Sequence, residues 1–118
     1  MFEIGVDIED INRFKKYSRK KDSDFLESIF AAEELNYSYS QKNYAKHLAA
    51  RFCAKEAFIK AISDYNIQIK HNNIKILNKQ NGKPEIKLPP EFDNIVCRVS
   101  LSHDKDKAIA FITIERSK

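Results

Sequence analysis

The segment from Asn43 to Asp64 constrains the fold of this chain more than any other. It contains neither glycine nor proline, and apolar side chains return at helical spacing, at Leu48, Phe52, Ile59 and Ile62. The segment therefore predicts one long helix. Arg51 and Lys55 fall inside the apolar arc of that helix. Glu56 and Lys60 lie at the edge of the arc, so charged side chains enter a face that ought to be buried.

A strand and several short helices are predicted before the long helix. Apolar and polar residues alternate from Phe2 to Ile8, which is the period of a half-buried strand and places Asp7 on its polar face, near its C-terminal end. Asp10 is a candidate cap for a short helix that follows. Asp24 starts a further short helix, and another is expected from about Ala32.

Strands are predicted after the long helix. A turn is expected over residues 80–84, and runs with strand character cover residues 73–78, 85–88, 95–102 and 108–114. The last run is apolar on both faces, which is typical of a central strand. The predicted class is α+β, with a first strand, a helical middle, and a mostly antiparallel sheet packed against the long helix.

The composition fits a single domain over residues 1–118. Hydrophobic residues make up 42% of the chain, enough for one core. Lysine and arginine number 21 against 17 aspartate and glutamate, and the net charge of +4 suits an acidic or phosphate-bearing partner without requiring nucleic acid. The N-terminus is acidic where a signal peptide is basic, and no apolar run approaches the roughly 18 residues of a membrane span. We therefore expect a cytoplasmic protein with no membrane partner.

The two cysteines, Cys53 and Cys97, are too few and too far apart for a metal knuckle or a disulfide framework. Each lies within an apolar pattern, where a free thiol acts as a small hydrophobic side chain.

Two carboxylates are candidates for chemistry, Asp7 at a strand end and Glu56 on the long helix. Such oxygen ligands suit Mg²⁺, which takes one or two protein carboxylates together with substrate phosphates. The pattern also allows a purely structural interpretation, in which Glu56 pairs with Lys60 four residues on and Asp7 caps the next helix. Both interpretations are open at this point.

Three further patterns carry less information. Ser102, His103 and Asp104 are consecutive and so point to opposite sides of an extended chain, which excludes a hydrolase triad. His103 alone is either a phosphate ligand or a turn residue. The chain has no glycine-rich phosphate loop. Basic residues near Arg13 are placed to recognise an acidic helix or nucleic acid, or they form a solvated face.

Four blocks stand in order along nearly the whole chain: Ile4-Gly5-Val6-Asp7-Ile8 with Asp10 and Arg13; Leu48-Ala49-Ala50-Arg51-Phe52-Cys53-Ala54-Lys55-Glu56-Ala57 with Lys60; Asn81-Gly82-Lys83-Pro84; and Ser100-Leu101-Ser102-His103-Asp104 before Ala108-Ile109-Ala110-Phe111. In this combination the chain resembles the bacterial holo-[acyl-carrier-protein] synthases, the short phosphopantetheinyl transferases. The resemblance implies the 4′-phosphopantetheinyl transferase fold.

The resemblance implies an enzyme that moves the 4′-phosphopantetheine arm of coenzyme A to a serine of apo-acyl carrier protein. Adenosine 3′,5′-bisphosphate is released, and the product serves fatty acid biosynthesis. In this family Mg²⁺ is held by the counterparts of Asp7 and Glu56 and by the coenzyme A pyrophosphate. Lys60 would assist the leaving group. The serine proton would pass to Glu56 itself or to a water on the metal, and the sequence leaves both open.

The resemblance also assigns binding residues. Four positions match the family's residues near the nucleotide end of coenzyme A: Arg51, Lys83, Pro84 and His103. Arg13 matches the arginine that meets acidic side chains of the carrier protein. Family members are homotrimers with sites between subunits, which implies that a neighbouring chain completes the cleft.

One departure from the family concerns the loop after Lys60. The family usually has a Leu-Gly-Thr-Gly turn there, whereas this chain has no glycine over residues 59–66, which puts backbone contacts to the ligand in doubt and allows a longer helix. Two rival functions are a broader carrier-protein transferase, typically about twice this length, and a non-catalytic basic module that binds an acidic helix or RNA. For the last, Asp7 and Glu56 would be dispensable.

Overall fold

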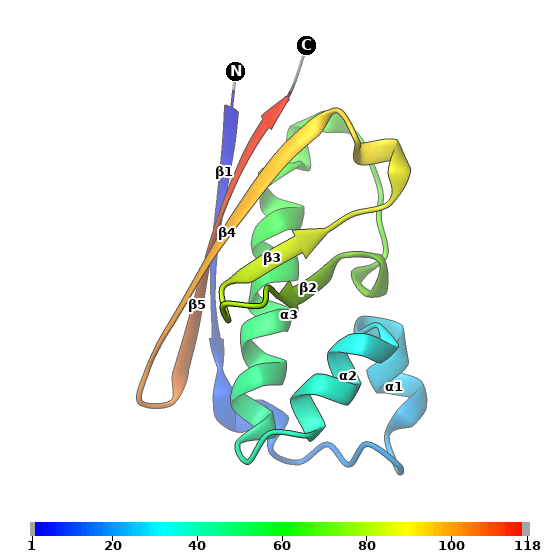
Figure 1. The fold of residues 1–118 in the computed structure, drawn as a ribbon, viewed down its shortest axis with the longest axis vertical. Coiled ribbons are helices and arrows are strands. Elements are labelled where there is room, and N and C mark those ends of the chain that lie inside the picture. The colour runs from blue at the N-terminus through cyan, green and yellow to red at the C-terminus, as the bar shows by residue number, and fades with distance from the viewer. Residues whose placement is uncertain (1, 117–118) are drawn as a thin grey trace.

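The computed structural model describes residues 2–116. Its helices and strands are β1 (Phe2–Asp10), α1 (Ser23–Ile29), α2 (Ala32–Tyr39), α3 (Tyr44–Ala61), β2 (Lys75–Asn78), β3 (Pro84–Lys87), β4 (Ile95–Asp104) and β5 (Lys107–Arg116) (Figure 1). Short 3-10 turns lie at residues 11–14, 63–65, 71–73 and 90–92. The predicted order of a strand, a helical middle and later strands is confirmed.

The strands pair antiparallel in two sheets. β5 lies between β1 and β4, as expected of the doubly apolar run, and β2 pairs with β3 in a separate hairpin. In Figure 1, α3 runs along one face of the three-stranded sheet, with α1 and α2 beside its N-terminal half. The α+β class is therefore confirmed. Within residues 2–116, no helix combines the length and the apolar character that a membrane span needs.

The short elements before α3 follow their sequence signals closely. Asp10 acts as the predicted cap, since its Oδ1 accepts a hydrogen bond from the Asn12 backbone N–H at 3.1 Å, although the element it caps is only the 3-10 turn at 11–14. α1 begins one residue before Asp24, and α2 begins at Ala32.

Helix α3 is shorter than its sequence pattern. It begins after Asn43, whose Oδ1 accepts the Lys46 backbone N–H at 3.3 Å, and it ends at Ala61 rather than at Asp64. The missing glycines do not lengthen it, because Asn66 adopts a left-handed conformation with φ of 55°. Asparagine tolerates this conformation better than most residues, so it turns the chain in place of glycine.

The core has two parts on α3. The C-terminal half of the helix packs on the sheet and on β2, with buried side chains that include Ala54, Phe58, Ile76, Ile112 and Ile114. The N-terminal half packs against α1, α2 and the 11–14 turn, with buried side chains that include Phe14, Leu26, Phe30, Leu48 and Phe52. Helix α3 therefore holds the sheet and the small helices together.

A buried ion pair crosses this core. Lys55 Nζ donates to Glu34 Oε1 at 2.7 Å and to the carbonyl oxygens of His71 and Ile74 at 2.9 and 2.5 Å, so all three of its N–H bonds are used. The other oxygen of Glu34 accepts the Ile76 backbone N–H at 2.9 Å. The pair links α2, α3 and β2, which explains why a charged residue lies inside the apolar arc of the helix.

The alternation of β1 suggests that its apolar face is buried, but in the structure its polar face is the one that packs against the core. Its apolar side chains, at Phe2, Ile4, Val6 and Ile8, are 54% to 61% exposed. The polar face lies under α3, where a Cβ on Gly5 would stand 1.9 Å from the carbonyl oxygen of Ala57. Only glycine allows this approach, and it places Asp7 and Glu9 beneath the helix.

Both cysteines are free thiols, as predicted. Burial raises the pKa of Cys53 and of Cys97 to about 12, so the two side chains act as hydrophobic groups rather than nucleophiles.

Candidate active site

Strand β1 and helix α3 bring Asp7 and Lys60 into contact. Lys60 Nζ donates to Asp7 Oδ1 at 3.0 Å and to the Val6 carbonyl oxygen at 3.1 Å. The hydrogen bond to Asp7, followed by the negative charge of Asp7, raises the pKa of Lys60. Asp7 Oδ2 is buried and has no hydrogen-bond partner among residues 2–116. One oxygen of this carboxylate is therefore held by a cation, and the other is buried with no donor from the described residues.

Glu9 adds a carboxylate that the sequence analysis missed. It lies two residues after Asp7 on the same strand face, and its Oε1 accepts from Arg13 Nη1 at 3.2 Å. Burial is the largest influence that raises the pKa of Glu9, and the neighbouring Asp7 carboxylate is the next. Glu56 raises it further, and Arg13 lowers it, so that the pKa of Glu9 is about 7. The two-residue period of the strand was the available signal for this position.

Glu56 is held by a residue from a distant turn. His71 Nε2 donates to Glu56 Oε2 at 2.7 Å, and the His71 ring stacks on Phe52 with a centroid distance of 5.8 Å and an interplanar angle of 9°. The purely structural interpretation, in which Glu56 pairs with Lys60 and Asp7 caps the next helix, does not describe these contacts. Glu56 bonds His71 rather than Lys60, and the cap of the next turn is Asp10 rather than Asp7.

The carboxylates of Asp7 and Glu56 suit a Mg²⁺ ion that a phosphate ligand helps to bind. Asp7 and Glu56 offer the carboxylate oxygens that Mg²⁺ prefers, and Asp7 Oδ2 is buried without a partner within the described residues. Across residues 2–116 no group of three or more histidine, cysteine or acidic side chains is placed to hold a metal. Mg²⁺ commonly completes its shell with water and substrate phosphates, so two carboxylates suffice for an ion shared with a phosphate ligand.

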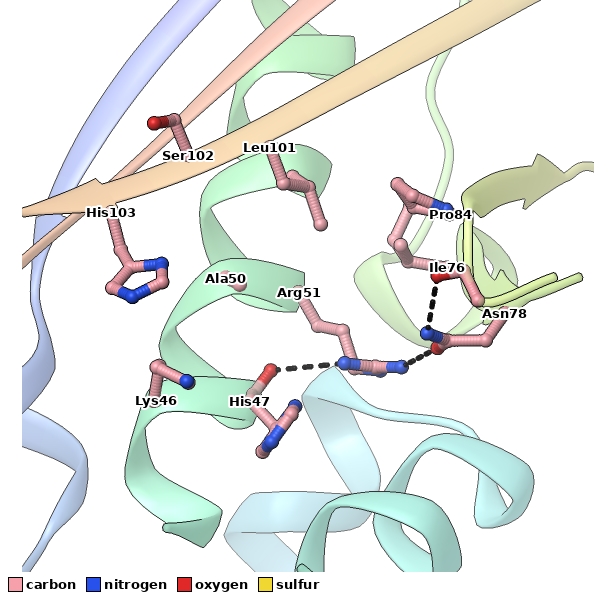
Figure 2. A pocket seen from close by; sticks show the side chains of 11 residues that line it. Lys46, His47, Ala50, Arg51, Ile76, Asn78, Pro84, Leu101, Ser102 and His103 are labelled. Atoms are coloured by element: carbon pink, nitrogen blue, oxygen red, sulfur yellow. Dashed lines mark hydrogen bonds between the residues drawn. The ribbon is translucent and has the colours of Figure 1, made fainter.

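A cavity of about 170 Å³ lies between α3, the β2–β3 hairpin and β4. Figure 2 shows its lining, which has basic and polar side chains at Lys46, His47, Arg51, Asn78 and His103, and an apolar side that includes Pro84. Arg51 and His103, which come from elements far apart in the sequence, line the same cavity. Three of the four residues expected near the nucleotide end of coenzyme A are thus brought together.

Arg51 is fixed in the wall of this cavity. It is only 4% exposed, its Nη2 donates to Asn78 Oδ1 at 2.5 Å, and its Nη1 donates to the His47 carbonyl oxygen at 3.4 Å. Its guanidinium lies 4.7 Å from the ring centre of Tyr37. Burial lowers the pKa of Arg51 from its usual high value. These contacts give the cation a single orientation.

Lys83 is the predicted residue that the cavity does not include. It lines a neighbouring hollow with Lys79 and Arg98, and the two hollows share Pro84. Lys46, His47 and Asn78 were missed by the sequence analysis. The signal for His47 was its position one helical turn before Arg51, on the same side of α3.

Arg13 lies beside the carboxylates. Its guanidinium stands 5.4 Å from the ring centre of Phe14 and 5.0 Å from that of Phe52, and it pairs with Glu9. Its side chain is half-exposed, and the basic segment at residues 15–21 follows it along the chain.

The sequence model of the 4′-phosphopantetheinyl transferase superfamily matches residues 3–112. The chain belongs to this superfamily. A holo-[acyl-carrier-protein] synthase of Thermodesulfovibrio yellowstonii is 40% identical over 111 residues, which are 94% of this transferase and 96% of the relative. The resemblance to bacterial holo-[acyl-carrier-protein] synthases is thereby confirmed, and the chain is an enzyme of the phosphopantetheinyl transferase type.

Solved structures agree with this transferase assignment. An ACPS–CoA complex from Chronobacterium ammoniagenes matches with a TM-score of 0.81 at 27% identity and covers 100% of this chain and 99% of the other. A holo-[acyl-carrier-protein] synthase from Helicobacter pylori in complex with coenzyme A matches with a TM-score of 0.80 at 30% identity, over 95% and 99% of the two chains. The predicted transferase fold is confirmed.

Proposed function

We propose that this enzyme transfers the 4′-phosphopantetheine arm of coenzyme A to a serine of apo-acyl carrier protein, releasing adenosine 3′,5′-bisphosphate, in fatty acid biosynthesis in the cytoplasm. The observation that carries the proposal is the pairing of Lys60 with Asp7, whose second oxygen is buried and unpartnered within the described residues. A cation beside a free carboxylate oxygen suits a divalent ion and a phosphate ligand together. The full chain, residues 1–118, would act as one domain.

Each residue of the carboxylate group has a place in this reaction. Asp7 and Glu56 would hold Mg²⁺, which when bound would neutralise charge on the pyrophosphate as the bond to the departing phosphate breaks. Lys60 would bind the same phosphates and stabilise the leaving group. His71 occupies Glu56 Oε2, which leaves Oε1 to bind the ion or to accept the serine proton.

The cavity would bind the nucleotide end of coenzyme A. Arg51 and His103 supply donors for a phosphate, and Pro84 supplies an apolar surface for the adenine ring. Lys83, in the adjoining hollow, would add positive charge at the mouth of the site. Because Arg51 is already held in one orientation, little side-chain entropy is lost when a phosphate binds.

We propose that the active site forms between subunits of a homotrimer. Arg51 and Glu56 are five residues apart on α3, and five residues turn a helix by about 140°. The cavity and the carboxylates therefore open on different sides of the same helix, and one chain by itself does not join them. The exposed apolar face of β1 supplies the surface that neighbouring chains would cover.

The carrier protein would dock beside the carboxylates. Arg13 is half-exposed next to Glu9, and the basic segment at residues 15–21 adds positive charge to the same part of the chain. An acidic carrier surface would be attracted to this region, which makes association fast and sensitive to salt.

Mass spectrometry of apo-acyl carrier protein incubated with coenzyme A, Mg²⁺ and this enzyme tests the proposal. We expect the carrier to gain one phosphopantetheine group, with an equal amount of adenosine 3′,5′-bisphosphate released. A carrier whose acceptor serine is replaced by alanine is the control and should gain nothing. If the enzyme binds the carrier but adds no mass, it is a non-catalytic acidic-helix binder and the proposal is wrong.

A further inference from the structure

The contact between His71 and Glu56 connects a distant turn to a carboxylate of the site. His71 lies 15 residues after Glu56, outside every predicted motif, yet its Nε2 is 2.7 Å from Glu56 Oε2. The Glu56 side chain is about one-third exposed, so its burial alone does not fix its rotamer. The hydrogen bond is the contact that selects one orientation of the carboxylate.

We infer that His71 is a positioning residue, which holds Glu56 Oε2 so that Oε1 is presented to a metal ion that binds together with coenzyme A. The inference rests on the proposed function, because it takes Glu56 as one of the two metal carboxylates. Hydrogen-bond partners of ligating carboxylates orient them, and their loss commonly weakens metal binding or activity 10- to 100-fold.

The ring of His71 is itself held in place. It lies parallel to Phe52 at a centroid distance of 5.8 Å, so one of its faces is covered by a side chain of α3. Phe52 and Glu56 are four residues apart on α3 and so lie on the same side of the helix. Phe52 stacks on the imidazole of His71, and Glu56 accepts its hydrogen bond.

The backbone under His71 is anchored to the core. The His71 carbonyl oxygen accepts from buried Lys55 Nζ at 2.9 Å, and from the Ile74 backbone N–H at 3.1 Å. The next residue, Asn72, donates from its side chain to the Glu27 carbonyl oxygen at 3.0 Å. The 3-10 turn at residues 71–73 is thus tied to α1 and α3, and the imidazole reaches Glu56 from a rigid base.

A side chain that merely filled space at this position would need the ring but not the N–H group. His71→Phe keeps a flat ring for Phe52 and removes the donor, whereas His71→Gln keeps an N–H donor and removes the ring. Asn72→Ala is the matched control, because it cuts the other side-chain bond of the same turn and leaves Glu56 untouched. The two functions of His71 are therefore separable.

The measurement is Mn²⁺ binding to the enzyme in the presence of coenzyme A, followed by electron paramagnetic resonance, with coenzyme A alone as the baseline. We expect His71→Phe to weaken Mn²⁺ binding about 10- to 100-fold and to lower kcat with little change in the KM for coenzyme A. His71→Gln should restore binding close to that of the wild type, and Asn72→Ala should bind as the wild type does.

Asp7→Asn separates this inference from the proposed function. If Asp7→Asn weakens Mn²⁺ binding and His71→Phe does not, the positioning role is wrong while the metal site stands. Equal losses in His71→Phe and Asn72→Ala would also overturn it, because the turn would then matter only structurally. If neither Asp7→Asn nor Glu56→Gln weakens binding, the metal site fails and the inference fails with it.

Discussion

At the scale of single residues, Lys55 and Glu34 show how a charge is accommodated inside this core. Both side chains are fully buried, and their oxygens and N–H groups are paired with each other or with backbone groups of Ala31, His71, Ile74 and Ile76. Removing one partner leaves the other charged and buried, which is far more destabilising than losing a surface pair.

Lys55→Met should lower the free energy of unfolding by about 3–5 kcal/mol, because Glu34 would stay buried without its cation. Urea unfolding measures this change. Lys75→Met is the matched control, since it removes the exposed partner of Glu33 at 3.1 Å and should change stability by no more than about 1 kcal/mol. Similar effects of the two substitutions would contradict the account of the buried pair.

His47 makes the stability of the folded chain depend on pH. Burial, followed by the charges of Arg51, Lys46 and His103, lowers the pKa of His47 from 6.5, and the Tyr37 ring packs edge-on against it. The unfolded chain therefore takes up a proton at higher pH than the folded chain does. This contribution to stability is present above pH 6.5 and is lost as the pH falls through the lower folded pKa.

We expect the wild type to lose stability relative to His47→Gln as the pH falls from about 7.5 to about 5. Urea unfolding gives the free energy of unfolding of both proteins at the two pH values. Subtracting the value of His47→Gln from that of the wild type removes the influence of every other titrating group. Parallel pH dependences of the two proteins would show that His47 is not held in its neutral form.

The predictability of the site also differs from residue to residue. Asp7, Glu56 and Lys60 follow from motifs within β1 and α3, and the structure brings Asp7 and Lys60 into contact. His71 carried no local signal, because its contact with Glu56 depends on how the chain returns after α3. Glu9 was accessible from the strand period, which places it beside Asp7.

At the scale of elements, β1 decides how closely α3 approaches the sheet. The alternation of the strand predicted its existence correctly but suggested the wrong face for packing. Periodicity shows that the two faces differ and does not show which one meets the helix. Gly5 is the residue that resolves this, because it is the position on that face without a side chain, and the backbone of α3 comes closest there.

Gly5→Ala should destabilise the enzyme by about 1–3 kcal/mol, because the added methyl group overlaps the Ala57 carbonyl oxygen and forces β1 away from α3. Urea unfolding is the measurement. Gly82→Asn is the comparison: a Cβ at Gly82 meets nothing within 4 Å, so the only cost there is the backbone strain of a φ of 88°, which asparagine tolerates better than most residues. Equal stability of Gly5→Ala and the wild type would mean that the close approach is not required.

Helix α3 and the central strand β5 were predictable because each has a long, unbroken pattern. The end of α3 was not, because the pattern continues to Asp64 while the helix ends at Ala61. The left-handed Asn66 turns the chain soon after α3, and a single asparagine is a weak signal in a sequence.

At the scale of the whole molecule, the exposed sheet face is the main feature that one chain leaves unexplained. The apolar side of β1 continues onto β5, where Val6 pairs with Phe111 and Ile8 pairs with Ile109. All four side chains are exposed. A contiguous apolar face of this kind is typical of a protein interface, which agrees with the proposed trimer.

Val6→Glu should therefore reduce the proposed trimer to monomers and abolish transfer, while the monomer stays folded. Light scattering after size-exclusion chromatography measures the mass, and circular dichroism measures the fold. Ile67→Glu is the matched control, because Ile67 is also exposed but lies in the loop after α3, away from the sheet face. A trimeric and active Val6→Glu protein would contradict the proposed interface.

The central claim is that the Asp7 carboxylate serves the transfer of phosphopantetheine rather than the fold. Mass spectrometry of apo-acyl carrier protein after reaction with coenzyme A, Mg²⁺ and either the wild type or Asp7→Asn tests it directly. We predict one added phosphopantetheine group with the wild type and none with Asp7→Asn, although both proteins give the same circular dichroism spectrum. Full transfer by Asp7→Asn, or no transfer by the wild type, would contradict the account.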